Sequence, residues 1–204
     1  MKKSKLSVIS SIQSNKSIEL YDHQIFAAMK VKNEFGGSAI LADEVGLGKT
    51  IEAGLIWTEL RARFDAGRLL VVCPAMLCQK WEDELLTRFG VNADICNASG
   101  LLERLKGSAT RSKRNFAIIC SLQGIRPPRG WNDSDTELTT GAAKLASFLE
   151  EQSVESSLLD CVIVDEAHYL RNPESQTHKL GKALREVSTA YIMLSATPIQ
   201  LKSH

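Results

Sequence analysis

The chain has 204 residues, of which 44% are hydrophobic, 24% are charged and 6% are aromatic. This is the composition of a folded globular domain, and it excludes wholesale disorder. The formal net charge is +1, so the chain as a whole lacks the basic excess that often marks nucleic-acid-binding proteins.

The N-terminal end is expected to be a flexible arm over residues 1–18, leading into a helix near residues 22–32. The chain starts with Met1, Lys2 and Lys3, but residues 6–15 are too polar for the apolar part of a signal peptide. No stretch approaches the roughly 20 apolar residues that a membrane helix needs. We therefore expect a soluble, cytoplasmic protein whose main domain covers residues 19–204.

Short apolar stretches alternate with amphipathic stretches along this domain. The predicted strands are residues 38–42, 69–73, 93–96, 116–121, 159–165 and 190–195. The predicted helices are residues 49–64, 76–89, 101–106, 142–152 and 175–187. Several strands carry apolar residues continuously rather than alternately, which is typical of strands buried on both faces of a parallel sheet. The alternation predicts an α/β fold with helices on both faces of the sheet.

Cysteines and tryptophans are expected to be core residues. Cys73, Cys120 and Cys161 lie in or beside apolar strands, and the five cysteines contain no C-x-x-C pair. Buried free thiols in a reducing cytoplasm therefore fit better than a disulfide framework or a zinc site. Trp57 and Trp81 lie on apolar helical faces, where core packing is expected.

Two segments leave alternatives open. Residues 104–114 contain no acid and five positive side chains, Arg104, Lys106, Arg111, Lys113 and Arg114. They form either a solvated helix end and loop or a surface that contacts phosphates. Residues 126–141 are a long connection rich in proline and glycine, which is either functional or disordered.

A strand, a glycine-containing turn and a helix follow one another over residues 38–52. Glycines such as Gly46 and Gly48 let successive backbone N–H groups curl around phosphate oxygens, and a helix N-terminus adds partial positive charge. Lys49 could then reach the β- and γ-phosphates, and the Thr50 hydroxyl could bind Mg²⁺. Asp43 stands where the usual pattern has glycine, so a plain glycine turn with a surface lysine is the alternative.

A second candidate site follows the apolar strand that ends near Asp165. Open α/β sheets bind ligands at the carboxyl ends of their strands. There Asp165 could hold Mg²⁺ through its water shell, and Glu166 could polarise the attacking water, a division of roles that phosphoryl transfer needs. Two solvated acids at a strand end are the alternative, which the upstream Gly-Lys-Thr sequence makes less favoured.

Six blocks occur in an order that resembles the superfamily-two helicases, and the Swi/Snf-type branch in particular. They are residues 20–24, 43–50, 72–81, 119–122, 165–172 and 194–200. The DEAH sequence of residues 165–168 is similar to motif II, and Asp43 is the branch's characteristic replacement for the first glycine. Glu44, Val45 and the SATP sequence of residues 195–198 resemble bacterial, RapA-like RNA-polymerase-associated members.

The resemblance implies a RecA-like (P-loop NTPase) three-layer fold, in which residues 19–204 form the first lobe of an ATP hydrolase. Relatives of this kind bind ATP and Mg²⁺, and translocate along double-stranded DNA without separating its strands. They thereby remodel bound protein, so RNA polymerase or another DNA-bound protein is an implied partner. We expect a nucleoid-associated bacterial protein.

The resemblance also implies a role for individual residues. The ATP-binding residues would be Gln24, Asp43, Glu44, Val45, Gly46, Leu47, Gly48, Lys49 and Thr50. Lys49, Asp165 and Glu166 would be catalytic, with Thr50 and Asp165 holding the metal. His168, Ser195 and Thr197 would couple the ATP site to DNA. Pro74, Ala75, Met76, Ser121 and Leu122 would contact DNA phosphates without reading sequence.

The chain ends at His204, shortly after the last block. The resemblance implies a second RecA-like lobe whose arginines complete the ATP site, and such an arginine is worth roughly 10³–10⁵ in rate. We therefore expect these residues alone to hydrolyse ATP slowly or not at all. A nucleotide-dependent binding module stays open as an alternative, although Glu166 argues against it. So does another single-lobe P-loop NTPase, which the Ser-Ala-Thr-Pro block and the lack of an evident acceptor-binding lid disfavour.

Overall fold

One parallel sheet organises the chain. The computed structural model describes residues 38–42, 48–109, 115–132, 138–152 and 157–195. Within these residues six strands pair in the order β1-β6-β5-β2-β4-β3, and every pairing is parallel. The strands are β1 (Ser38–Ala42), β2 (Arg68–Cys73), β3 (Asp94–Cys96), β4 (Phe116–Ser121), β5 (Leu159–Val164) and β6 (Ser188–Ser195).

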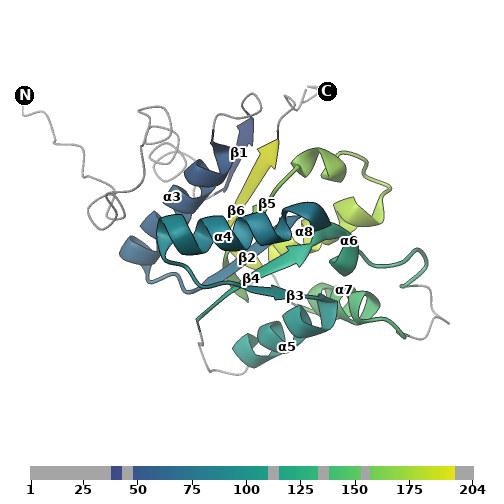
Figure 1. The fold of residues 1–204 in the computed structure, drawn as a ribbon. Coiled ribbons are helices and arrows are strands. Elements are labelled where there is room, and N and C mark those ends of the chain that lie inside the picture. The colour runs from purple at the N-terminus through teal and green to yellow at the C-terminus, as the bar shows by residue number, and fades with distance from the viewer. Residues whose placement is uncertain (1–37, 43–47, 110–114, 133–137, 153–156, 196–204) are drawn as a thin grey trace, which may run out of the picture.

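Helices cover both faces of this sheet (Figure 1). On one face lie α3 (Lys49–Phe64) and α4 (Cys78–Phe89), which share a core with the sheet. On the other face lie α5 (Ala98–Ala109), α6 (Leu122–Ile125), α7 (Gly141–Glu150) and α8 (Gln176–Glu186). The predicted three-layer α/β fold is therefore confirmed.

The strands are buried on both sides, as their apolar sequences predict. In β2, Leu69 and Val71 pack with α3 and α4, whereas Leu70 and Val72 pack with the helices of the opposite face. All four side chains are 0–1% exposed. Successive side chains of a strand point to opposite faces, so a strand inside a three-layer fold must be apolar at nearly every position.

Local capping explains where several helices begin and end. The Ser175 hydroxyl accepts a hydrogen bond from the His178 amide at the start of α8, and the Thr140 hydroxyl does the same for Ala143 in α7. Gly90 ends α4 in the left-handed conformation, with φ 61°, which glycine adopts without strain. These caps set boundaries within two residues of the predicted ones for α7 and α8.

The prediction differs from the structure mainly in the short elements. The helix predicted over residues 101–106 is longer in the structure, where α5 covers Ala98–Ala109. The helix predicted to start at Met76 starts at Cys78 as α4, after a 3-10 turn, η1 (Ala75–Leu77). The four-residue helix α6 and the 3-10 turn η2 (Ala167–Leu170) were not predicted. Elements of three or four residues are too short to carry a hydrophobic period.

Several other predictions concern packing. Cys73, Cys120 and Cys161 are fully buried, as expected, and burial raises the pKa of each of these thiols. Trp131, in the long connection 126–141, is 5% exposed and packs on Ala143 and Ala146 of α7. This part of the connection is therefore anchored to the domain.

The N-terminal arm and the helix near 22–32 lie outside the described residues. In the described part of the chain, no helix combines the length and the apolar character needed to cross a membrane.

Candidate functional site

The carboxyl ends of the strands bring the separate sequence blocks to one edge. Because every strand is parallel, the segments after β1, β6, β5, β2 and β4 leave the sheet on the same side, in that spatial order. Ala42, the last residue of β1, pairs with Ser195, the last residue of β6. Neighbouring strands lie about 4.8 Å apart. The ends of β1 and β5 are thus about 10 Å apart, with β6 between them.

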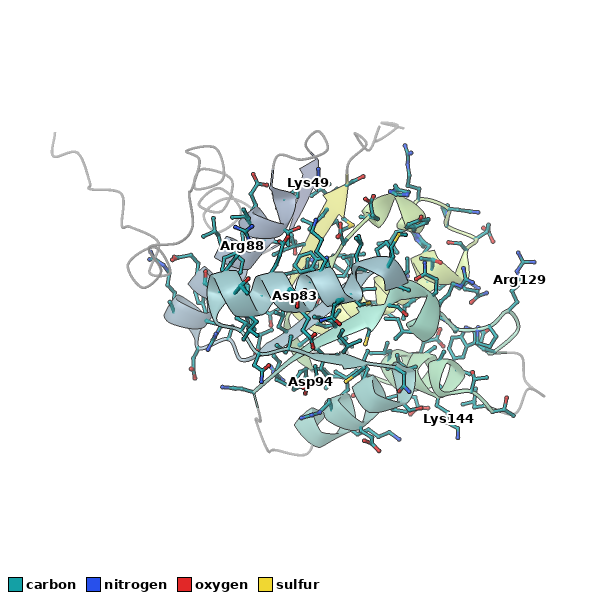
Figure 2. The ribbon with its side chains drawn as sticks, in the orientation of Figure 1. Lys49, Asp83, Arg88, Asp94, Arg129 and Lys144 are labelled. Carbon is teal, nitrogen blue, oxygen red and sulfur yellow. The ribbon has the colours of Figure 1, made fainter. Side chains whose placement is uncertain are left out.

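The first part of the site is the start of α3. Gly48 is the N-terminal cap of this helix and has φ 84° and ψ 31°, a left-handed conformation that favours glycine. Its carbonyl accepts hydrogen bonds from Ile51 and Glu52, at 2.8 and 3.1 Å. Lys49 and Thr50 are the first two residues of the helix and are half-buried. Figure 2 shows Lys49 near the carboxyl end of β1. The partial positive charge of a 16-residue helix therefore lies at this edge.

Asp165 provides the second part, directly after β5. Cys161 and Ile163 of β5 belong to the core under α3 and α4, so the alternation of the strand places Asp165 on the same face. Its amide donates to the Val72 carbonyl at 2.8 Å, which ties it to β2. Its Oδ1 accepts a hydrogen bond from the Glu166 amide at 2.8 Å, and its Oδ2 accepts one from Trp81 Nε1 at 2.9 Å. Both carboxylate oxygens are therefore fixed in direction.

Glu166 has a strained backbone. Its φ of 52° and ψ of 48° are left-handed, and in the described part of the chain it shares a positive φ with one other non-glycine residue, Asp65. Such a conformation costs about 1–3 kcal/mol and often occurs at functional sites. The Glu166 Oε2 lies 2.9 Å from His168 Nδ1. The predicted water activator and the predicted coupling histidine are thus in direct contact.

Of the remaining residues predicted for nucleotide binding or coupling, the structure describes some and not others. Ser195 is 1% exposed at the end of β6, between the phosphate-loop strand and β5. Gln24, residues 43–47 and Thr197 lie outside the described residues. His178 lies in α8, and its Nδ1 is 2.8 Å from the Leu170 carbonyl oxygen. It therefore links α8 to η2.

The predicted DNA-contacting segments lie on the other half of the edge, after β2 and β4. The Ala75 amide donates to Gln123 Oε1 at 3.2 Å, which joins the two segments. Met76 is 86% exposed, whereas Leu122 is 5% exposed, so a contact by Leu122 would use its main chain. The Ser121 hydroxyl accepts a hydrogen bond from the Gly124 amide at 3.0 Å and caps α6.

Two members of the basic run have partners away from this edge. Arg104 Nη2 lies 3.2 Å from Asp94 Oδ2, and Lys106 Nζ lies 5.9 Å from the centre of the Phe148 ring. These contacts favour a solvated helix surface for Arg104 and Lys106. Arg111, Lys113 and Arg114 lie outside the described residues.

Sequence reasoning missed two contacts of the site. Trp81 is 2% exposed, as expected for a core residue, but its N–H also contacts Asp165, which is 84 residues away in the chain. Gln123 joins the two candidate DNA segments. A pairing across such a separation leaves no local signal, although a buried tryptophan usually needs a partner for its N–H.

Together, a parallel α/β sheet, a glycine-capped helix after the first strand and paired acids after β5 define a P-loop nucleotide-binding fold. The SNF2-related domain family matches residues 21–204 of this sequence. Matching curated relatives are the RNA polymerase-associated protein RapA of Photobacterium profundum and that of two strains of Vibrio cholerae. Each is 32% identical over 185 residues, which is 89% of this chain and 17% of the relative.

Among solved structures, the chain resembles the Sulfolobus solfataricus SWI2/SNF2 ATPase core in complex with dsDNA. The TM-score is 0.61 and the identity 22%, over 91% of this chain and 33% of that chain. The chain therefore belongs to the SNF2-related domain family and has the RecA-like fold of that ATPase core, which confirms the predicted Swi/Snf-type resemblance. It spans about a sixth of the length of the curated relatives it matches.

Proposed function

We propose that this chain is the ATP-binding lobe of a DNA-dependent ATPase that moves along duplex DNA and remodels protein–DNA complexes. The observation that carries the proposal is the shared sheet edge. The start of α3, with Lys49 and Thr50, lies on the same edge of the sheet as Asp165 and Glu166, and on the same face as Asp165. Phosphate-binding and metal-binding chemistry would meet there, at the place where open α/β sheets bind ligands.

The residues of this edge fit ATP and Mg²⁺. The Thr50 hydroxyl and the Asp165 carboxylate are hard oxygen ligands, which Mg²⁺ prefers. The N-terminus of α3 and Lys49 supply positive charge for the phosphates. Bound Mg²⁺ would neutralise charge that develops on the phosphate oxygens during transfer.

Each residue then has a separate task in hydrolysis. Lys49 would bind the β- and γ-phosphates, and Asp165 and Thr50 would hold the metal. Glu166 accepts a proton from the attacking water, and His168, 2.9 Å from its carboxylate, holds it in place. Hydrolysis by these 204 residues alone is proposed to be slow, because a second lobe would supply the arginines that complete the site.

Substitutions of Lys49 and Glu166 test the nucleotide site. Lys49→Ala should reduce the affinity for Mg²⁺–ATP by at least tenfold, because a phosphate-binding charge is lost, an estimate based on about 1.5–3 kcal/mol for a charge-assisted hydrogen bond. Glu166→Gln should keep that affinity, because the water activator does not bind the ground-state nucleotide. Equal affinity in the wild type and Lys49→Ala, measured by calorimetry, would overturn the proposal.

The nucleic-acid half of the proposal places duplex DNA against residues 74–76 and 121–122. Met76→Glu puts a negative charge on a side chain that is 86% exposed, so it should weaken duplex binding several-fold by repelling phosphates. Leu86→Glu is the matched control, since Leu86 is an exposed apolar residue of α4, 51% exposed. Anisotropy of a labelled duplex measures both variants, and an equal loss in both would argue against this surface.

The relatives' names suggest the biological setting. They are RNA polymerase-associated proteins, so we propose RNA polymerase, or another DNA-bound protein, as the partner of the whole protein, in the bacterial cytoplasm on the nucleoid. Co-purification of RNA polymerase with the tagged natural protein tests this assignment.

A further inference from the structure

Trp81 stands out because its one polar atom contacts the proposed metal-holding carboxylate. The side chain comes from α4 and is 2% exposed, inside the core that α3 and α4 form with the sheet. Its Nε1 lies 2.9 Å from Asp165 Oδ2. A buried indole N–H usually has an acceptor, and here that acceptor is a carboxylate at the functional edge.

Among the described residues, the other side-chain contact of the Asp165 carboxylate is made by its second oxygen with a main-chain amide. Oδ1 accepts the Glu166 amide at 2.8 Å, a contact within the same turn of chain. The indole on Oδ2 is the contact that comes from a different element of the fold. Without it, the carboxylate could rotate about its Cβ–Cγ bond, because one hydrogen bond to the following amide does not fix the plane of the carboxylate.

The helix that carries Trp81 is firmly attached at its start. The Leu77 amide donates to the Pro74 carbonyl at 2.8 Å, and the sulfur atoms of Cys73 and Cys78 lie 3.6 Å apart. Trp81 is one helical turn after Cys78. The indole is therefore held at a fixed place relative to the end of β2, which itself pairs with β5.

We propose that Trp81 is a positioning residue for the nucleotide's metal: its indole N–H holds Asp165 in the orientation that takes the metal, so α4 forms part of the nucleotide site. The inference rests on the proposed function, and it adds a residue from outside the phosphate loop and the paired acids. Groups that orient a metal ligand from behind typically matter by 10–100-fold in metal affinity.

The chain offers a close control in Trp57. Trp57 is also 2% exposed and belongs to the same core. Among the described residues its Nε1 has no hydrogen-bond partner. Trp81→Phe and Trp57→Phe therefore remove the same atoms from the same layer, and they differ in the hydrogen bond to Asp165.

The measurement is the affinity of the chain for mant-ADP as a function of Mg²⁺ concentration, followed by anisotropy. Trp81→Phe should need about tenfold more Mg²⁺ for the same affinity, and affinity without Mg²⁺ should be unchanged. Trp57→Phe should leave both unchanged. Equal Mg²⁺ dependence in the two variants overturns the inference.

A double-mutant cycle separates positioning from general disturbance. In an Asp165→Ala background the Trp81→Phe substitution should no longer change the Mg²⁺ dependence, because there is no carboxylate to orient. A tenfold effect that persists in that background overturns the inference. If the wild type does not bind mant-ADP, or if Lys49→Ala binds it as tightly as the wild type does, the proposed function is overturned instead.

A measurement on the wild type covers the case in which Trp81→Phe does not fold. The indole N–H resonances of the tryptophans can be assigned with Trp57→Phe and Trp131→Phe. Addition of Mg²⁺ to the ADP-bound chain should shift the Trp81 resonance, because its acceptor then binds metal, and leave that of Trp57 in place. An unmoved Trp81 resonance overturns the inference.

Discussion

Asp160 provides a strong test of how the edge opposite the functional site is stabilised. Its Oδ2 accepts hydrogen bonds from the Gly67 amide (2.8 Å), the Arg68 amide (2.8 Å) and Arg68 Nε (3.2 Å), and its Oδ1 accepts one from Arg68 Nη2 at 2.6 Å. These bonds join the amino ends of β2 and β5. We expect Asp160→Asn to destabilise the chain, because an amide turns an N–H toward these donors.

The size of the effect follows from burial. The side chains of Asp160 and Arg68 are 21% and 13% exposed. Removing one partner of a fully buried pair costs about 3–5 kcal/mol, so partial exposure puts Asp160→Asn near the lower end, at about 3 kcal/mol. Asp94→Asn is the control. Its ion pair with Arg104 joins side chains that are 61% and 50% exposed, and exposed pairs contribute about 0–1 kcal/mol.

The pH dependence of the stability difference between the wild type and Asp160→Asn is a second test of this contact. Burial acts to raise the pKa of Asp160, but the hydrogen bonds from the Arg68 side chain and from the Gly67 and Arg68 amides outweigh it, so the pKa lies below its ordinary value of 3.8. A carboxyl whose pKa is lowered by folding stabilises the protein above its unfolded pKa, and this contribution is lost as the pH falls through the folded pKa. The difference between wild type and Asp160→Asn should therefore be full at pH 7 and shrink below about pH 4.

Urea unfolding at pH 7 and at a series of lower pH values measures both quantities. Asp160 lies five residues before Asp165, at the opposite end of β5, about 16 Å away along an extended strand. Nucleotide affinity at pH 7 should therefore be unchanged. A loss of less than about 1 kcal/mol at pH 7, or a loss of equal size at pH 3, would refute this account of the contact.

Three further predictions concern packing, strain and thiol reactivity. Gly54→Ala should destabilise the chain by about 1–3 kcal/mol, because a Cβ there would lie 2.2 Å from the Phe89 ring. Gly107→Ala in α5 meets nothing within 4 Å, and should be neutral or stabilising by up to about 1 kcal/mol in thermal unfolding. Glu166→Asn should be more stable than Glu166→Gln by about 0.5–1 kcal/mol, since asparagine adopts the left-handed conformation more readily, and equal melting temperatures would contradict this. A thiol reagent at pH 8 should modify Cys96 first. Burial raises the pKa of Cys73, Cys96, Cys120 and Cys161 alike, but Cys96 is partly exposed whereas the other three thiols are fully buried. Mass spectrometry showing earlier labelling of Cys161 would contradict the buried assignment.

Many of the secondary-structure elements could be predicted from the local sequence. The strands of the sheet were predictable because they contain continuous apolar runs between amphipathic stretches, as in residues 69–73 and 161–164. The start of α3 was predictable because Gly48, Lys49 and Thr50 form a contiguous block at a strand–helix junction. The position of Asp165 and Glu166 at the end of a buried strand was predictable from the apolar run that precedes them.

The tertiary structure decided what separate blocks do to one another. Strand order cannot be read from a parallel α/β sequence, yet it puts Ser195 between β1 and β5 and places the two candidate DNA segments together on the other side of β5. The left-handed backbone of Glu166 and its contact with His168 also depend on how η2 packs. Trp81 and Asp165 are 84 residues apart, and only the pairing of β2 with β5, with α4 packed over them, brings the indole to the carboxylate. Local propensity acts over a few residues, whereas these contacts arise from the arrangement of whole strands and helices.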